Sequence, residues 1–235
     1  MKEKFKTFLF LKRIDSILIV FIKMIREIVL FIFLFLVFQK GNSQETFVFK
    51  DGDLLFQTGK GSEFENAITL STAKIEDFSF SHVGVLSFEN DSVFVLEASS
   101  ESGVSKIFIN DFMKKSSVTV VGRLKPQYGY VIPEAIKNIK LLVGKPYDFV
   151  YLKDNDAYYC SELIQVTFKL NDGTSIFETI PMTFKNKNTG EILEFWTEHY
   201  KRHNEKIPEG KPGTNPVQLS KSDKIELVKI ISGDL

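Results

Sequence analysis

The sequence contains very little cysteine and histidine, with one cysteine and three histidines among 235 residues. A single cysteine excludes an internal disulfide, which leaves Cys160 as buried filler, as an intermolecular link or as a reactive group. The histidines are His82, His199 and His203. Chemistry that depends on a thiol or an imidazole can therefore be sought at only four positions.

The chain also lacks net charge, with 30 basic and 30 acidic residues. The first 43 residues hold eight lysines and arginines and three acids, so the remainder has 22 basic and 27 acidic residues and a net charge of −5. A mildly acidic domain is a poor candidate for binding nucleic acid. Apolar residues make up 43% of the chain, which is the composition of a globular protein.

A long hydrophobic run is missing as well. The apolar stretch IVLFIFLFLVF at residues 28–38 is shorter than the roughly 20 residues of a membrane-spanning helix. Arg26 precedes this stretch, and Gly41-Asn42-Ser43 follows it with small residues at positions −3 and −1 before Gln44. A charged start, a short apolar run and a small-residue cleavage site are typical of a secretory signal peptide.

We therefore predict a signal peptide over residues 1–43, with Met24 as an alternative translation start. Cleavage would leave residues 44–235 as one exported domain, periplasmic or extracellular, which is large enough for a sizeable core. The alternative is an uncleaved N-terminal anchor, and the chain would then touch a membrane only through this segment.

Apolar patterns and turn signals predict strands in the centre of the chain and helices mainly after them. The expected strands are residues 53–58, 83–88, 93–98, 104–109, 118–124 and 225–231, and the expected helices are residues 133–143, a helix from Cys160, and residues 191–203. Residues 59–81 form a polar connection with one possible helix around residues 65–70, and whether this connection is a lid stays open. Residues 208–216 are expected to form a rigid surface loop. This order predicts an α+β fold in which an antiparallel sheet packs against helices.

Cys160 opens the run CSELIQVTFKLN, which has the pattern of a buried helix. Ser161 and Glu162 fall in the first turn, where helix starts favour such residues. A thiol at a helix N-terminus meets the positive end of the helix dipole, which favours the thiolate. Free cysteine is also among the most buried residue types, so a purely structural role is the competing interpretation.

A thiolate nucleophile needs a nearby base and a group that orients the base. His199 and His203 are spaced i, i+4 on a charged helix, but no third ligand accompanies them, which favours a solvated helix face over a metal site. His82 stands where a loop meets a strand. If residues 89–91 form the hairpin turn, Glu97 comes opposite residue 83 or 82, beside the His82 ring. A plain surface glutamate is the alternative.

Several motifs in the chain resemble those of NlpC-type cell-wall peptidases, which have a papain-like fold. The motifs are GDLLF at residues 52–56, AIT at 67–69, SHVGVL at 81–86, VLEAS at 95–99, GKPYDF at 144–149 and YCSEL at 159–163. In the standard order the cysteine comes first, whereas here it follows the histidine. The sequence therefore resembles the circularly permuted, YiiX-like papain-like hydrolases, over essentially the whole mature chain.

This resemblance implies Cys160 as the nucleophile, His82 as the base and Glu97 as the residue that orients the histidine. Tyr159 matches a position that lines the site, with oxyanion donation or packing as its two candidate roles. Asp53 matches the aspartate of the GD motif, for which a structural role is expected.

The predicted function is that of an exported cysteine hydrolase that cleaves an amide, with a cell-wall peptide as the suggested substrate. No metal or organic cofactor is expected, and no nucleic-acid partner. Two alternatives stay open. One is a thioesterase, lipase or acyltransferase that acts on acyl esters. The other is a non-catalytic envelope binding module in which Cys160 is only buried.

Overall fold

The computed structural model describes residues 21, 23–31, 47–72 and 78–232, in two compact units, Met1–Phe47 and Val48–Leu235. In the first unit, residues 23–31 are helical and exposed. Within the described ranges no helix is both long and apolar enough to cross a membrane. The candidate cleavage site before Gln44 lies outside the described residues, so the signal peptide stays a prediction.

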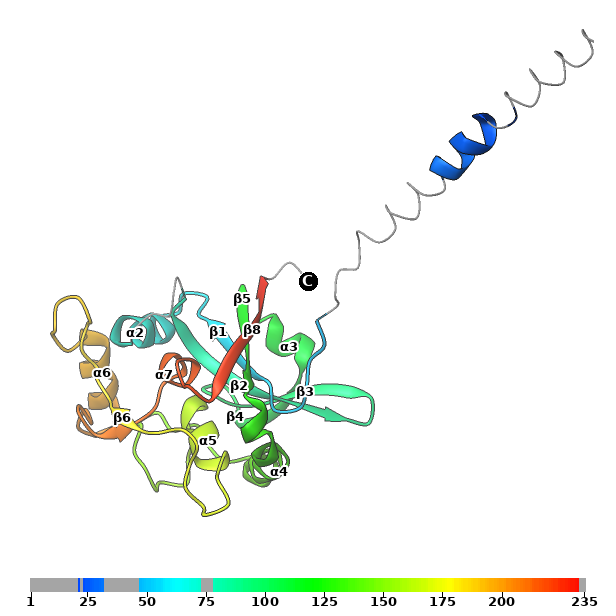
Figure 1. Cartoon of the computed structure of the whole chain (residues 1–235). Coiled ribbons are helices and arrows are strands. Elements are labelled where there is room, and N and C mark those ends of the chain that lie inside the picture. Colours follow the sequence, from blue (N-terminus) through cyan, green and yellow to red (C-terminus); the bar gives the residue numbers. More distant parts are fainter. Residues whose placement is uncertain (1–20, 22, 32–46, 73–77, 233–235) are drawn as a thin grey trace, which may run out of the picture. The chain divides into compact units, whose positions relative to one another are not determined.

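The second unit is built on one antiparallel sheet of six strands (Figure 1). Its strands are β1 (Leu54–Thr58), β2 (Phe80–Glu89), β3 (Ser92–Ser99), β4 (Gly103–Phe108), β5 (Val118–Leu124) and β8 (Ile225–Ser232). They lie in the order β4-β3-β2-β1-β5-β8, so the C-terminal strand closes one edge beside β5. A small second sheet pairs β6 (Ile180–Pro181) with β7 (Pro212–Gly213).

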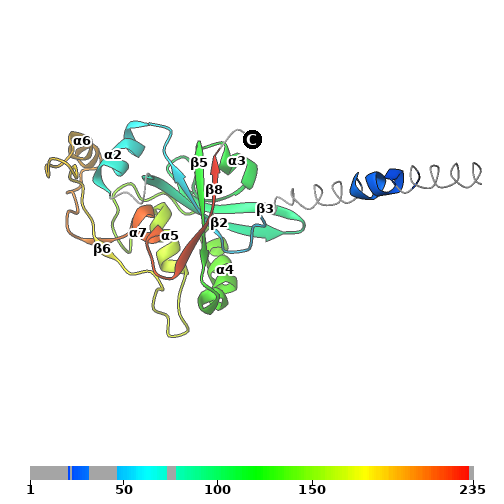
Figure 2. The same ribbon diagram turned by 45° about the horizontal axis from the view of Figure 1, so that its top comes forward.

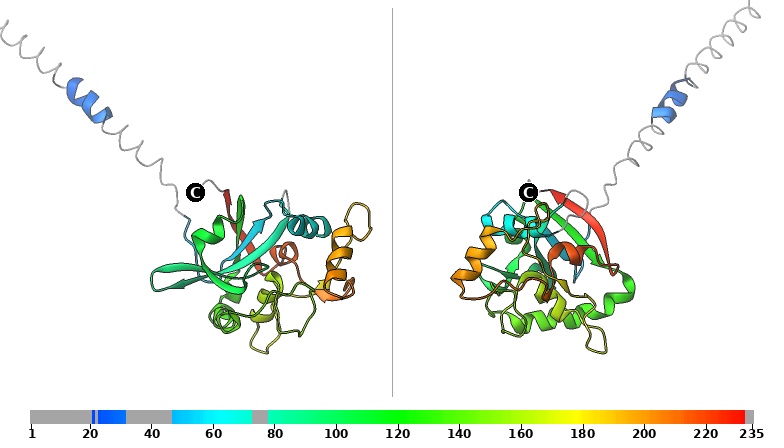
Figure 3. Two further views of the ribbon diagram at one scale, coloured as in Figure 1. Left: turned by 180° about the vertical axis from the view of Figure 1, so that it is seen from behind. Right: turned by 90° about the vertical axis from the view of Figure 1, so that its left-hand side faces the viewer.

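Helices cover both faces of the large sheet (Figures 1 and 2). The helices are α2 (Glu63–Ser71), α3 (Ile109–Met113), α4 (Ile132–Leu142), α5 (Cys160–Thr167), α6 (Glu194–Arg202) and α7 (Pro216–Ser220), with a 3-10 turn at Pro126–Val131. Helices α5 and α7 pack on β2, whereas α3 packs on β3 and β4. Helix α6 lies against α2 at one end of the domain, as the left view of Figure 3 shows.

The alternating apolar residues of the strands explain the main core. Val83, Val85, Leu96 and Ala98 are fully buried and belong to one hydrophobic cluster with Leu163 of α5. A second, mostly aromatic cluster consists of Ala67, Phe184, Trp196 and Tyr200 and lies between α2 and α6. The core therefore holds the start of α5 against the sheet and joins α6 to α2.

The predicted strands and helices agree with the observed ones to within a few residues. The hairpin turn falls at Asn90 and Asp91, which both adopt positive φ angles, as a tight two-residue hairpin requires. The prediction of a surface loop at residues 208–216 is wrong in part, because Thr214 and Pro216 are buried and α7 begins at Pro216.

Asp53 has the structural role that the GD motif suggests. Its buried carboxylate accepts two hydrogen bonds of 2.7 Å from the Arg123 guanidinium of β5 and one of 2.8 Å from the Lys50 backbone N–H. Asp53 therefore ties the start of β1 to β5 and to the chain that leads into the sheet.

Candidate active site

Cys160 is the first residue of α5, and only 5% of its surface is exposed. Tyr159 before it is extended, with φ −95° and ψ 165°, so the helix begins abruptly at the cysteine. The first N–H groups of a helix have no carbonyl partner within the helix. The thiol thus stands beside the backbone N–H groups of the first turn, at the positive end of α5.

His82 and Glu97 meet on one face of the β2–β3 hairpin. Glu97 pairs with Gly84, two residues beyond His82, and Glu97 Oε2 lies 2.6 Å from His82 Nε2. The predicted pairing of residue 97 with residue 83 or 82 was wrong by one residue or two. The observed register places the two side chains together because residues 82 and 84 share a face of the strand, whereas residue 83 points to the other face.

A β-bulge lies next to the histidine. Gln57 pairs with His82 but Thr58 pairs with Phe80, so Ser81 is the extra residue on β2. Bulges bend a strand and redirect its side chains, and they are common beside active sites. The bulge explains how a residue at the strand end can face a cysteine that belongs to a helix on the opposite side of the sheet.

Glu97 is completely buried, and both of its carboxylate oxygens are occupied. Oε2 contacts His82, and Oε1 accepts a hydrogen bond of 2.6 Å from Lys115 Nζ. Burial alone would raise the pKa of Glu97, but the hydrogen bonds and positive charges of His82 and Lys115 outweigh it and lower that pKa. Glu97 is therefore an ionised buried carboxylate with two cationic neighbours.

Burial alone would lower the pKa of His82, but hydrogen bonds to Cys160 and Glu97, together with their negative charges, raise it to about 10. Since Nε2 is the nitrogen that contacts Glu97, Nδ1 is left to face the thiol. The arrangement stabilises an imidazolium between two negatively charged groups, which is what a thiolate–imidazolium pair requires.

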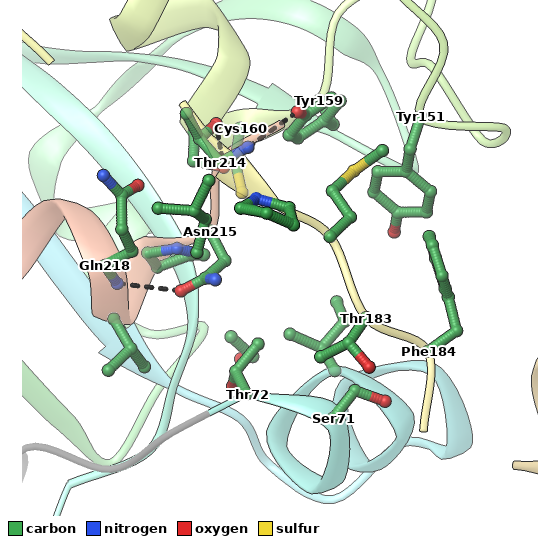
Figure 4. A pocket seen from close by; sticks show the side chains of 18 of the residues that line it. Ser71, Thr72, Tyr151, Tyr159, Cys160, Thr183, Phe184, Thr214, Asn215 and Gln218 are labelled. Carbon is green, nitrogen blue, oxygen red and sulfur yellow. Dashed lines mark hydrogen bonds between the residues drawn. The ribbon is translucent and has the colours of Figure 1, made fainter. Parts of the chain in front are cut away.

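Two pockets meet at this pair. The first, here called the Cys160 pocket, has a volume of about 430 Å³ and includes Cys160 in its wall, whereas the second, the His82 pocket, has a volume of about 850 Å³ and includes His82. Ile68, Ser81 and Tyr147 line both. Figure 4 shows the Cys160 pocket, with Cys160 above and Ser71 and Thr72 of the α2 end across from it.

Comparison with known proteins shows the family of the chain. Residues 48–229 match the model of the permuted papain-like amidases, the YaeF/YiiX or C92 family. The chain belongs to this family. It is therefore an enzyme of the cysteine-hydrolase class with a circularly permuted papain-like fold, and amide hydrolysis is the activity of the family.

A solved structure supports the fold assignment. The crystal structure of the metalloprotein YiiX from Escherichia coli O157:H7 matches with a TM-score of 0.64 and 22% identity, over 78% of this chain and 98% of that chain. No curated protein matches the sequence.

That relative is called a metalloprotein, which raises the question of a metal site among the described residues of this chain. Within the described ranges, no group of three or more histidine, cysteine, aspartate or glutamate side chains could hold a metal ion. His199, predicted to lie on a solvated helix face, is only 5% exposed, and its Nε2 lies 2.7 Å from the Phe149 carbonyl oxygen. That prediction was wrong for His199, because α6 turns this residue toward the ring of Phe64 in α2; His203 is exposed.

Lys115 is a residue of the candidate site that the sequence did not reveal. It follows α3 and reaches Glu97 on β3, although the two residues are separated by 18 positions. A lysine in a charged stretch, KKSS, gives no signal of its own. Only the packing of α3 on β3 and β4 brings the ammonium group to the buried carboxylate.

Tyr159, which precedes the cysteine, lies in the wall of the Cys160 pocket. Its hydroxyl oxygen accepts a hydrogen bond of 3.1 Å from the Thr214 backbone N–H, and its ring packs edge-on against Tyr151 at 4.9 Å between centroids. Figure 4 shows this bond joining the start of α5 to the segment before α7. These contacts favour the packing role over the oxyanion role.

We therefore expect Tyr159→Phe to lower stability more than catalysis. The variant leaves the buried Thr214 N–H without its acceptor, which costs about 1–3 kcal/mol of unfolding free energy. Loss of an oxyanion donor would instead lower kcat by about 10²–10³-fold. Urea unfolding together with kcat on an amide substrate separates the two roles, and a loss of that size in kcat at unchanged stability would contradict the packing role.

Proposed function

We propose that the chain is an exported cysteine amidase in which Cys160 is the nucleophile, His82 the general acid and base, and Glu97 the residue that orients His82. The observation that carries this proposal is the position of the His82 ring. One ring nitrogen contacts the buried carboxylate of Glu97, and the ring also interacts with the thiol of Cys160.

The reaction would proceed in two steps. The Cys160 thiolate attacks the amide carbon and forms a C–S bond, and the backbone N–H at the start of α5 stabilises the oxyanion. The C–N bond then breaks, and the amine nitrogen takes the proton of His82 Nδ1 as it leaves. Neutral His82 next removes a proton from water, which attacks the thioester and releases the acid and the thiolate.

Glu97 would hold the ring for both steps. Its contact with Nε2 fixes the orientation that points Nδ1 at the thiol, and its charge stabilises the imidazolium. Lys115 occupies the other carboxylate oxygen and so fixes the carboxylate itself. A peptide of the cell wall is the substrate that the NlpC resemblance suggests, by analogy of fold. Export to the periplasm or the outside rests on the signal-peptide pattern of residues 1–43.

Alkylation of Cys160 tests the triad directly, because Cys160 is the chain's one cysteine. We expect iodoacetamide to react with the native chain almost as fast at pH 6.5 as at pH 9, because His82 supplies the positive charge of the pair. In His82→Ala, the rate should rise about tenfold per pH unit through the neutral range, as for an ordinary thiol.

The variant leaves Glu97 paired with Lys115, so it does not create an isolated buried charge. His203→Ala is the matched control, because it removes an exposed imidazole that stacks on Phe149. Native protein and both variants should melt cooperatively. If native chain and His82→Ala show the same pH dependence, the triad is refuted and the binding-module alternative gains support.

A further inference from the structure

Glu97 divides its charge between two cations. The residue is completely buried, its Oε2 lies 2.6 Å from His82 Nε2, and its Oε1 accepts a hydrogen bond of 2.6 Å from Lys115 Nζ. The negative charge of Glu97 favours the protonated form of His82. A positive charge at the other oxygen weakens that effect, because an ammonium and an imidazolium repel each other. The proton affinity of His82 therefore depends on Lys115, which acts through the carboxylate.

Lys115 is held in place by contacts that lead back to the strand beside His82. Its backbone N–H donates at 3.0 Å to the Phe112 carbonyl oxygen, which also accepts a hydrogen bond of 2.8 Å from the buried Gln57 side chain. Gln57 is the residue of β1 that pairs with His82. The next residue, Ser116, donates from its hydroxyl to a carbonyl oxygen of β1 at 2.7 Å. The segment after α3 is thus tied to β1, and the Lys115 side chain is only 34% exposed.

The remaining charged groups of the His82 pocket come from the elements around the ring. Two are acids, Glu65 of α2 and Glu101 after β3, and two are cations, Lys60 before α2 and Arg202 of α6. Tyr147, His199 and His203 are the other titratable groups of the wall, and Cys160 interacts with the ring from α5. The two acids and the two cations balance in formal charge. Among the residues that the structure describes, only His82 and Lys115 form ion pairs with Glu97, so Lys115 has the most direct influence on the imidazole.

The acidity of protonated His82 matters for one kind of leaving group. In the proposed reaction the C–N bond breaks as the amine takes the proton of the ring, and an imidazolium that holds its proton more firmly is the weaker acid. A p-nitrophenyl ester releases a phenolate that needs no proton. A cation that shares the charge of Glu97 would therefore speed the cleavage of amides and leave such esters unaffected.

We propose that Lys115 is a positioning residue that keeps protonated His82 acidic enough to protonate a leaving amine, and that it thereby sets the preference of the site for amides over esters with acidic leaving groups. This inference rests on the proposed cysteine amidase function and adds the residue that suits the catalytic pair to amides. The rival role is purely structural, in which Lys115 neutralises the buried carboxylate without any effect on the ring.

The test measures the pKa of His82 by NMR titration of the histidine rings in the full chain. The chain has three histidines, and the signal of His82 is the one that disappears in His82→Ala. Lys115→Met removes the ammonium group, whereas Lys115→Gln removes the charge but keeps a hydrogen-bond donor for Glu97. Both should raise the pKa of His82 above its native value of about 10, by about one pH unit. Lys115→Arg keeps the charge and should keep the native value.

Lys114→Met is the matched control, because it removes the neighbouring ammonium group. The Lys114 side chain is 75% exposed and pairs with Asp111. Lys60 donates to the Lys114 backbone carbonyl oxygen, which the variant retains. The control should leave the pKa of His82 unchanged. All variants should melt cooperatively, and if Lys115→Met does not fold, Lys115→Gln gives the same comparison with the hydrogen bond preserved.

The preference for amides gives a second readout. N-Acetylalanylglycine and the p-nitrophenyl ester of N-acetylalanine share an acyl group and differ in whether the leaving group needs a proton. Lys115→Met should lower kcat/KM for the amide about threefold, because the rate of proton transfer follows the acidity of the donor only in part. The ester should be cleaved as by the native chain. Since kcat/KM ends with acylation, the first irreversible step, hydrolysis of the acyl-enzyme does not enter the comparison.

Each outcome decides between the roles. A higher pKa of His82 in Lys115→Met and Lys115→Gln, with native values in Lys115→Arg and Lys114→Met, supports the inference. An unchanged or lower pKa in the folded variants, or an equal loss of rate for amide and ester, refutes it but leaves the amidase function standing. If His82 of the native chain titrates near the ordinary value of about 6.5, the pair with Cys160 does not exist, and the proposed function fails as well. If neither probe is cleaved, the titration alone decides.

Discussion

Replacing Cys160 by serine should lower kcat/KM for amide hydrolysis by about 10⁴–10⁶-fold, the size of loss seen when the nucleophile of a triad is removed. In the proposed mechanism the attacking group is a thiolate beside protonated His82, whose pKa is raised to about 10. A serine hydroxyl is a far weaker acid than a thiol, so it does not ionise beside His82. A hydroxyl that stays protonated is a weak nucleophile, so the serine variant keeps the shape of the site but loses the attacking group.

The measurement is steady-state amide hydrolysis, with the thermal melt of the variant as a check on folding. Serine differs from cysteine by one atom, and α5 should keep its packing on β2. Binding of an uncleaved substrate analogue should change by only a few-fold. Unchanged release of amine by Cys160→Ser would show that another group attacks, and the cysteine hydrolase assignment of the site would then be wrong.

The sequence points to the three residues of the candidate site because each carries a local signal. Cys160 opens an apolar helical pattern, His82 enters a strand after a polar connection, and Glu97 stands at the end of the partner strand. The tight turn at residues 90 and 91 limits the uncertainty in the pairing of the two strands to one residue or two. That limit brings Glu97 near His82 but does not place both on one face, since a shift of one residue reverses the face.

The rest of the site depends on contacts between segments that are distant in the chain. Lys115 reaches Glu97 only because α3 folds onto β3 and β4. The wall of the Cys160 pocket includes Thr214 and Val217, from a stretch whose prolines and glycines resemble a surface loop. Pro216 instead starts α7, and the Tyr159 hydroxyl draws Thr214 to the start of α5. No local pattern in the sequence encodes these contacts.

The geometry of the candidate site depends on which elements are neighbours in space and not on their order in the chain. In this chain β2 and β3 precede α5, and β8 returns to the sheet after it. The hydrophobic cluster that joins Val83 and Val85 to Leu163 fixes α5 against β2. When the start of a helix is held at the end of a strand, the thiol faces the imidazole whichever of the two segments comes first in the sequence.

Glu97→Gln should lower kcat/KM by about 10²–10⁴-fold and also change its dependence on pH. The hydrogen bond and the charge of Glu97 both help to raise the pKa of His82, so the neutral amide of glutamine should lower that pKa from about 10. His82 must be protonated to give its proton to the leaving amine. The activity of the native enzyme should therefore fall as the pH rises through about 10, and in the variant it should fall at a distinctly lower pH.

The profile of kcat/KM against pH is the decisive measurement, because it reports the free enzyme and separates an electrostatic role from simple loss of structure. Glu89→Gln is the matched control: Glu89 ends the same strand, β2, but it pairs with Lys106 and Lys140 and has no contact in the described structure with His82. The control should keep both its rate and its basic limb near pH 10. A lower rate in Glu97→Gln without movement of the basic limb would mean that Glu97 only supports the fold, and that His82 keeps its proton through its contact with Cys160 alone.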